Sequence, residues 1–235
     1  MIPKPTRPIL KYLVISLLMV SSAGAYAFDT NPFLEKKKEV FLDSLASSTN
    51  SRGSNYFNID ESCSEEQYHQ LVAAIGMVFM MSNLATHENC EEHGYQKWFD
   101  DKCDAQIHRR VKEVYSQISD NLNKGNIGLV CEELNTGHCS KNKLIIAYTR
   151  KNQPLVWVCN ANFFEYPIVV DRDSEEDTTI SVLTHEFSHN LGNTDDHVFG
   201  PDGSRKLDRE QRIKNADNYG YYINYLMDRE NPSRR

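Results

Sequence analysis

His185-Glu186-Phe187-Ser188-His189 is the stretch of this 235-residue sequence that decides the fold. It has the form HExxH. Two histidines four residues apart lie on one face of a helix, where both imidazoles can bind a single Zn²⁺. The glutamate beside the first histidine can act as a general base on a water molecule at the metal. The motif therefore predicts metal-dependent peptide hydrolysis, with Glu186 as the catalytic residue.

The sequence around the motif predicts the helix that the motif requires. From residue 178 to residue 191, apolar residues recur at intervals of three and four and form one stripe of a helix, opposite the two histidines. Asp177 or Thr178 can cap the start of this helix, and Gly192 suits a left-handed residue at its end. The histidines are therefore expected to face a cleft. The stripe comprises Ile180, Leu183, Phe187 and Leu191.

The first 27 residues have the features of a secretory signal peptide. Lys4, Arg7 and Lys11 form a positive segment, an apolar core runs from residue 12 to residue 20, and Ala25-Tyr26-Ala27 is a typical cleavage site. The apolar core is too short to span a bilayer comfortably, and we expect no membrane span in the rest of the chain. The sequence predicts a soluble protein that is secreted or periplasmic.

The charge of the chain bears on its partners. Removal of residues 1–27 takes away three positive charges and no negative ones, which changes the formal net charge from −7 to −10. An acidic chain is a poor binder of nucleic acid and of anionic membranes. We therefore expect neither partner, and we expect a monomer.

All six cysteines lie in the exported part of the chain. An even number of cysteines in an oxidising compartment predicts three disulfides, and the absence of a CxxC pair argues against a second zinc site. The sequence alone allows fifteen pairings. The cysteines are Cys63, Cys90, Cys103, Cys131, Cys139 and Cys159.

Ahead of the HExxH helix, the pattern predicts helices first and strands later. Residues 28–62 read as a leader or linker, and a short pro-segment that is removed on activation is one interpretation of them. Apolar residues at helical spacing predict helices over 65–86 and 101–122. Short β-branched and aromatic runs at 144–148 and 155–158 predict a β-hairpin, which Cys139 and Cys159 bracket and can close. His87 and His93, between the two helices, are expected at the surface.

A catalytic zinc needs a third protein ligand as well as an open position for water. The segment after the helix offers three candidates within three residues: Asp195, Asp196 and His197. The residues alone leave the choice among them open.

This part of the sequence resembles the aspzincin metallopeptidases, which include the deuterolysins and the peptidyl-lysine endopeptidases. Their signature is HExxH followed by GTxDxxYG, and residues 193–200, Asn-Thr-Asp-Asp-His-Val-Phe-Gly, match it with Asn for Gly and Phe for Tyr. Trp98-Phe99, the Cys139–Cys159 hairpin and residues 215–219 also look like family features in the same order. The resemblance covers about residues 63–226 and implies that Asp196 is the third zinc ligand.

Three departures from the family pattern affect function. The segment between the motif and Asp196 looks short, which keeps Asp195 as a second choice of ligand. Phe199 replaces the tyrosine that family members use to stabilise the oxyanion. In lysine-specific relatives an Asp and a Glu three residues later bind the lysine after the scissile bond; Asp217 matches the Asp, but Gly220 takes the place of the Glu. Asp217 is the predicted substrate-binding residue.

The resemblance implies an α+β fold over residues 63–235: a mainly helical, zincin-type domain with a small β-hairpin or sheet, stabilised by disulfides. It also implies a zinc metalloendopeptidase that binds one Zn²⁺ through His185, His189 and Asp196 and cuts proteins or peptides, with Lys favoured after the scissile bond. Two alternatives stay open. One is a weak or inactive binding protein on a peptidase scaffold, and the other is a metzincin-like peptidase that uses Asp195.

Overall fold

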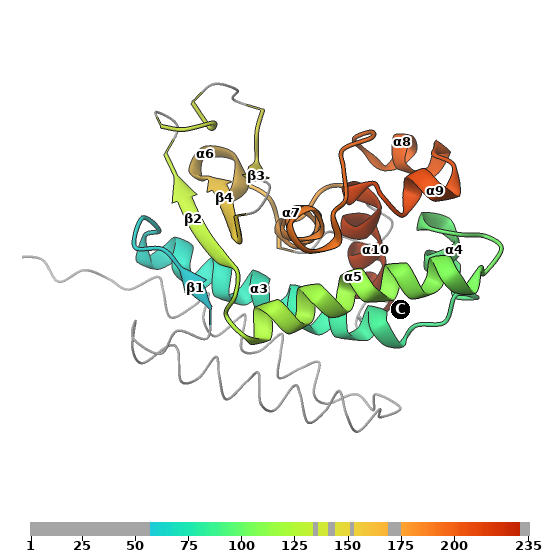
Figure 1. The fold of residues 1–235 in the computed structure, drawn as a ribbon. Helices are drawn as coiled ribbons and strands as arrows, with labels where there is room; N and C mark the ends of the chain where they lie inside the picture. The colour runs from blue at the N-terminus through green and yellow to red at the C-terminus, as the bar shows by residue number, and fades with distance from the viewer. Residues whose placement is uncertain (1–56, 134–135, 141–143, 151–152, 169–174, 231–235) are drawn as a thin grey trace, which may run out of the picture.

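The computed structural model describes residues 57–133, 136–140, 144–150, 153–168 and 175–230 (Figure 1). The predicted signal peptide and most of the predicted leader lie outside these ranges. Within them the fold is α+β: helices predominate, and a small sheet forms one side of the molecule. This arrangement confirms the predicted fold class.

The sheet has four short strands in the order β1-β2-β4-β3. They are β1 (Asn58–Ile59), β2 (Gly128–Glu132), β3 (Ala147–Thr149) and β4 (Leu155–Cys159). β2 runs parallel to both of its neighbours, and β3 runs antiparallel to β4. The predicted hairpin is therefore present, although its first strand begins at Ala147 and leaves Leu144 exposed. β1 lies within the segment predicted as leader, so the folded part of the chain extends beyond the predicted boundary at residue 63.

Two long helices, α3 (Glu65–His87) and α5 (Ala105–Asn123), form the base of the fold and pack against each other. Ser64 caps α3 through a reciprocal pair of hydrogen bonds with Gln67. α5 begins later than the sequence predicts, because Asp104 is its N-cap and the preceding Cys103 has a positive φ of 54°. The helical pattern predicted for both segments is confirmed.

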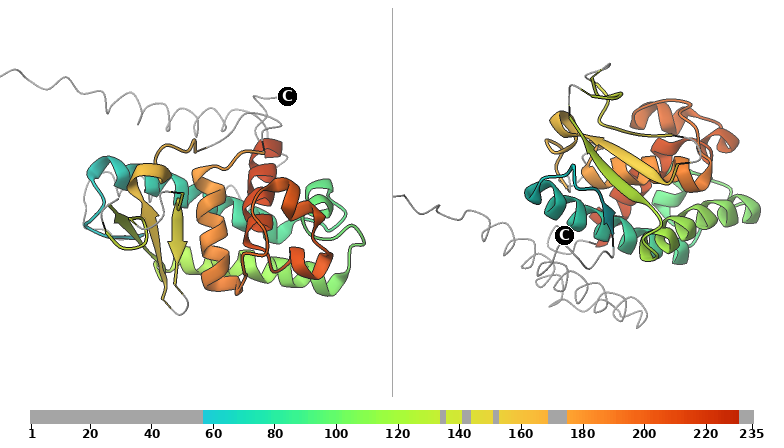
Figure 2. Two further views of the ribbon diagram at one scale, coloured as in Figure 1. Left: turned by 90° about the horizontal axis from the view of Figure 1, so that it is seen from above. Right: turned by 60° about the vertical axis from the view of Figure 1, so that its left-hand side comes forward.

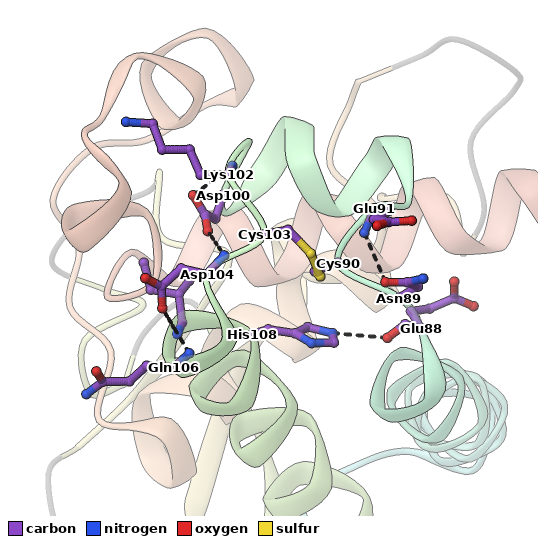
Figure 3. Close-up of a disulfide and its surroundings, with 11 residues drawn as sticks. Glu88, Asn89, Cys90, Glu91, Asp100, Lys102, Cys103, Asp104, Gln106 and His108 are labelled. Carbon is purple, nitrogen blue, oxygen red and sulfur yellow. Dashed lines mark hydrogen bonds between the residues drawn. A yellow bond between two sulfur atoms is a disulfide. The ribbon is translucent and has the colours of Figure 1, made fainter.

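The connection between α3 and α5 contains the short helix α4 (His93–Trp98) and is fixed at several points (Figure 3). A disulfide joins Cys90 to Cys103 across it. The Asp100 carboxylate accepts hydrogen bonds from the backbone N–H groups of Lys102 and Asp104, and Nε2 of His108 lies 3.0 Å from the carbonyl oxygen of Glu88. The prediction that His87 and His93 lie at the surface is confirmed, since both are exposed.

The other two disulfides join Cys63 to Cys131 and Cys139 to Cys159. The first ties the start of α3 to β2, and the second closes the β-hairpin, as the sequence suggested. All six cysteines are paired, so the predicted count of three disulfides is confirmed.

Helix α7 (Thr179–Gly192) occupies the centre of the molecule, between the sheet and α10 (Ala216–Glu230) (Figure 2, left). It contacts β3 on one side, α10 on the other, and α3 and α5 beneath. Its apolar residues Ile180, Leu183 and Phe187 are fully buried, as the stripe predicts. Short helices complete the fold: α6 (Asn160–Phe163), α8 (Pro201–Lys206) and α9 (Arg209–Arg212).

One expectation about membranes needs correction. α3 is long enough and, with a mean hydropathy of 1.2, apolar enough to cross a bilayer, although the sequence was expected to hold no such segment. In this fold α3 is instead a core helix: Leu71, Ile75 and Val78 are completely buried against its neighbours. Its apolar character is explained by this packing.

Candidate metal centre

The HExxH helix is held at both ends by local hydrogen bonds. Thr178 caps its start, because its hydroxyl accepts from the N–H of Ser181 while the Ser181 hydroxyl accepts from the N–H of Thr178. At the other end Asn193, with φ of 52°, is the left-handed residue. The sequence pattern predicts Gly192 as the left-handed residue, which is wrong. Gly192 is instead the last helical residue, and a Cβ on it would lie 2.7 Å from Val114 of α5, so glycine permits close helix packing.

Three side-chain atoms meet at one point beside this helix. Nε2 of His185 and Nε2 of His189 are 3.1 Å apart, and each lies 3.1 Å from Oδ1 of Asp196. Ligand atoms about 2.0 Å from a tetrahedral zinc would be roughly 3.3 Å from one another. The three donors therefore have the chemistry and the mutual spacing that Zn²⁺ requires.

The opposite nitrogens of both imidazoles are engaged by acceptors. Nδ1 of His189 lies 2.9 Å from the carbonyl oxygen of Thr194, and Nδ1 of His185 lies 2.6 Å from Oδ1 of Asp217. A carbonyl oxygen can only accept, so Nδ1 of His189 carries the hydrogen and Nε2 is left with a lone pair. Each ring is thereby oriented with its Nε2 toward Asp196, the arrangement typical of histidine ligands.

The electrostatics of the cluster favour positive charge at its centre. Burial lowers the pKa of His185, but hydrogen bonds with Asp196 and Asp217 outweigh burial and raise it to about 10. Burial raises the pKa of Asp196, yet its two histidine partners hold that pKa well below the usual range. A group of donors that stabilises cations in this way suits a divalent metal ion.

Glu186 lies beside the cluster and is almost completely buried, with 6% of its surface exposed. Its Oε1 is 3.9 Å from Nε2 of His185. Burial raises the pKa of Glu186, and the two nearby histidines lower it by a smaller amount. The carboxylate is thus placed next to the three donors and has an increased affinity for a proton.

Asp196 belongs to the segment between α7 and α8. Its side chain joins the cluster of donors, whereas the side chains of Asp195 and His197 do not. Asp195 forms an isolated bridge with Asn215 through its backbone. The side chains of Asp195 and His197 are exposed, and among the described residues the converging donors at this point are His185, His189 and Asp196.

Asp217, at the start of α10, has both carboxylate oxygens occupied. Oδ1 is the partner of His185, and Oδ2 accepts a hydrogen bond of 2.7 Å from the backbone N–H of Gly200. Its predicted role in binding substrate stays a prediction, but these two contacts direct the carboxylate toward the metal centre. No local pattern in the sequence indicates this pairing, which joins residues 32 positions apart.

Gly220 has a packing reason to be glycine. A Cβ at this position would lie 2.7 Å from the carbonyl oxygen of Ser181 on α7, closer than such contacts occur. The close approach of α7 and α10 therefore excludes a glutamate here, where the lysine-specific relatives are expected to have one.

Phe199 is 73% exposed, and its ring lies 6.4 Å from that of His185 with nearly parallel planes. Its ring offers no hydroxyl. The tyrosines of α10 are directed elsewhere: Tyr219 donates to the carbonyl oxygen of Ile213, Tyr221 donates to Asp177, and Tyr222 is completely buried. These three aromatic rings belong to the core.

An acidic pocket of about 560 Å³ adjoins the segment that carries Asp196, since Gly200 and Pro201 form part of its wall. Of its four carboxylates, Glu175 is paired with Lys97 and Arg205. Asp177 accepts a hydrogen bond from Tyr221, and its pKa is raised first by burial and then by the nearby Asp217. The remaining lining residues are Glu165, Tyr166, Pro167, Glu176 and Tyr221.

A second group of potential ligands consists of Glu132, Cys139 and Cys159. The two cysteines form a disulfide, which removes both thiolates as ligands. This group is therefore no metal site.

Comparisons with known proteins agree with the geometry. The sequence is similar to the neutral protease 2 homolog MEP2 of Coccidioides posadasii, with 29% identity over 214 residues, covering 86% of this chain and 56% of that protein. It is also similar to neutral protease 2 of Aspergillus oryzae, with 24% identity over 172 residues, covering 70% of this chain and 48% of that one. The chain spans about half the length of these curated relatives.

Among solved structures, a zinc peptidase from Grifola frondosa has the same fold, with a TM-score of 0.55 and 22% identity, over 70% of this chain and 98% of that one. The family described as lysine-specific metallo-endopeptidase, aspzincin M35, matches residues 84–224. That range includes the HExxH helix, Asp196 and Asp217. The chain therefore belongs to the aspzincin M35 family.

Proposed function

We propose that this protein is a zinc-dependent endopeptidase whose metal ligands are His185, His189 and Asp196. The observation that carries the proposal is the convergence of their three donor atoms, each 3.1 Å from the other two, beside the buried carboxylate of Glu186. Membership of the aspzincin M35 family supports both the reaction and the metal. Asp195 is not among the donors that converge at this point, which argues against its use as the ligand.

Each residue of the centre has a separate task. When bound, Zn²⁺ makes a water molecule more acidic and polarises the scissile carbonyl group. Glu186 takes a proton from the attacking water and delivers it to the leaving amine, a task helped by its raised pKa. Asp217 and the Thr194 carbonyl hold the two imidazoles in the orientation that ligation requires.

We further propose that the acidic pocket receives a basic side chain of the substrate, with lysine after the scissile bond as the expected residue. Asp217 is committed to His185 and Gly200, so the charge must come from another carboxylate. Asp177 is suited to this, because burial and the nearby Asp217 raise its pKa and so destabilise the anion, which a cation in the pocket would stabilise. The family description supports the preference for lysine.

Residues 1–27 and the three disulfides support export from the cytosol, where disulfides are rare. We therefore propose a secreted or periplasmic, monomeric enzyme that acts on proteins or peptides. The alternative, an inactive binding protein on a peptidase scaffold, is motivated by Phe199. The complete set of donors and the buried Glu186 favour the enzyme.

A digest of a peptide library, read by mass spectrometry with and without chelator, tests the proposal. We expect cleavage that chelator abolishes and Zn²⁺ restores. Glu186→Gln should lose cleavage by at least about a hundredfold and keep its zinc, since general acid–base catalysis contributes that much. Cleavage that survives Glu186→Gln would refute the mechanism, and stoichiometric zinc without any cleavage would favour the binding protein.

A further inference from the structure

The third ligand occupies a part of the chain that has no helix or strand to hold it. Residues 196–200 lack regular secondary structure, and the side chain of Asp196 is 42% exposed. Burial therefore contributes little to its position. A ligand in such a segment must be fixed by hydrogen bonds of the backbone around it, because the distance to the imidazoles depends on that backbone.

Two of those hydrogen bonds are made to one buried side chain. Oδ1 of Asn215 accepts from the backbone N–H groups of His197 and Val198, at 3.0 and 3.2 Å. These are the two residues that directly follow Asp196. Asn215 is completely buried.

The other end of the same amide is anchored in the protein. Nδ2 of Asn215 donates to Oδ1 of Asn218 at 2.8 Å and to Oγ of Ser204 at 3.3 Å. Asn218 in turn donates to the carbonyl oxygen of Trp98 on α4 at 2.6 Å. The side-chain amide of Asn215 thus links residues 196–200 to three helices, α4, α8 and α10. Its oxygen accepts from residues 197 and 198, and its nitrogen donates to α8 and α10.

The backbone beside Asn215 adds further bonds to the same segment. The N–H of Asp195 donates to the carbonyl oxygen of Lys214 at 2.7 Å, and the N–H of Ala216 donates to the carbonyl oxygen of Asp195 at 3.1 Å. These bonds fix the residue before Asp196, and Asn215 fixes the two residues after it.

We propose that Asn215 is a positioning residue for the metal centre, which presents Asp196 to the zinc through the N–H groups of His197 and Val198. The inference rests on the proposed function, because it assumes that Asp196 is a ligand. Asn215 does not contact the ion or the substrate; it acts through the backbone of Asp196. An amide is required because the side chain must accept from two backbone N–H groups and also donate to the side-chain oxygens of Ser204 and Asn218. Asparagine has both an acceptor oxygen and a donor nitrogen.

A double-mutant cycle on zinc affinity, measured by competition with a chromophoric chelator, tests this role. We expect Asn215→Ala to weaken zinc binding by 10- to 100-fold, the range seen when residues that orient ligands are removed. Ser204→Ala is the matched control, because it removes one acceptor of the amide and leaves the bonds of Asn215 to His197 and Val198. It also removes the bond from the Ser204 hydroxyl to the Gly200 carbonyl oxygen, which keeps its bond to the backbone N–H of residue 204. Its zinc affinity should stay within about threefold of the wild type. If Asn215 acts through Asp196, then Asn215→Ala should cost little further affinity in an Asp196→Ala background.

The outcomes separate the inference from the proposed function. A wild-type protein that binds no zinc would refute both. Zinc binding in the wild type with full affinity in Asn215→Ala, or with additive losses in the double mutant, would overturn the role of Asn215 alone. If Asn215→Ala does not fold, hydrogen exchange in the wild type decides: the amides of His197 and Val198 should be protected, and exchange at the rate of free peptide amides would overturn the proposal.

Discussion

Oδ1 of Asp217 lies 2.6 Å from Nδ1 of His185, while Oδ2 of the same carboxylate accepts from the N–H of Gly200. One side chain of α10 thus fixes His185, a proposed metal ligand on α7, and the turn that follows Phe199. Only a carboxylate can accept from both donors at once, since asparagine would present an NH₂ group to one of them.

Replacement of Asp217 should therefore weaken metal binding. We expect Asp217→Asn to lower zinc affinity by 10- to 100-fold, with kcat reduced at subsaturating metal and largely recovered at high Zn²⁺. Chelator competition measures the affinity. If Asp217 instead binds substrate lysine, zinc affinity should be unchanged and KM for lysine peptides should rise.

The adjacent carboxylates Asp195 and Asp196 should behave differently. Asp196→Ala removes a donor 3.1 Å from both imidazoles, and we expect it to lose most of its zinc on dialysis. Asp195→Ala keeps the backbone bridge to Asn215 and should retain about one zinc per chain. Atomic absorption on both purified variants gives the comparison, and the reverse order of zinc contents would support the metzincin-like alternative.

Substrate preference should depend on Asp177. Asp177→Asn removes the charge and keeps an acceptor for the Tyr221 hydroxyl, so the fold should persist. We expect kcat/KM for peptides with lysine after the scissile bond to fall about tenfold or more, and values for peptides with leucine there to change little. Glu175→Gln is the control, because Glu175 is already paired with Lys97 and Arg205. An equal loss for both peptides would contradict a role in recognising charge.

Phe199 offers a test by gain of function. Its exposed ring stacks near His185, and the resemblance to the aspzincins implies that a tyrosine hydroxyl normally serves the oxyanion from this position. We expect Phe199→Tyr to raise kcat by about tenfold or more with little change in KM, since one donor to an oxyanion is commonly worth a hundredfold. Phe199→Leu controls for the loss of the ring. An unchanged kcat would mean that another group stabilises the oxyanion.

Acid should weaken the cap of α5. Asp104 accepts hydrogen bonds from the N–H groups of Gln106 and Ile107, and these bonds lower its pKa. A carboxylate whose pKa is lower in the folded state stabilises the protein above its unfolded pKa of about 3.9, and this contribution is lost as the pH falls through the folded value. Asn caps without titrating, so the Tm of the wild type should fall more steeply below pH 4 than that of Asp104→Asn. Parallel curves would contradict this assignment.

Local patterns in the sequence were enough for the helices α3, α5 and α7 and for the first two proposed metal ligands, whereas α10 and the short helices were not predicted. The apolar stripe of α7 predicts the face from which His185 and His189 project. Both residues lie on one helix, so no contact with a distant segment has to be known. β2 was missed for the opposite reason. It pairs with β1 and β4 through parallel contacts far apart in the chain, and a run of five residues gives little periodic signal.

The choice of the third ligand, proposed to be Asp196, shows the same limit. Sequence spacing left Asp195, Asp196 and His197 open, and the choice depends on how Asn215 and Lys214 hold the intervening backbone. The contact between Asp217 and His185 likewise depends on the packing of α10 against α7. A side chain that accepts backbone N–H groups in an irregular segment is the expected use of asparagine, but no local pattern says which segment it meets.

The three disulfides lie within residues 63–159, and the sequence has no cysteine after Cys159. The final third of the chain, which holds the HExxH helix and Asp196, therefore has no covalent cross-link of its own. A metal ion bound by His185, His189 and Asp196 would join two segments of that third. Loss of the metal would then remove this link between the two segments as well as the reaction, so metal-free protein is expected to be digested faster by an added protease than the metal-bound form.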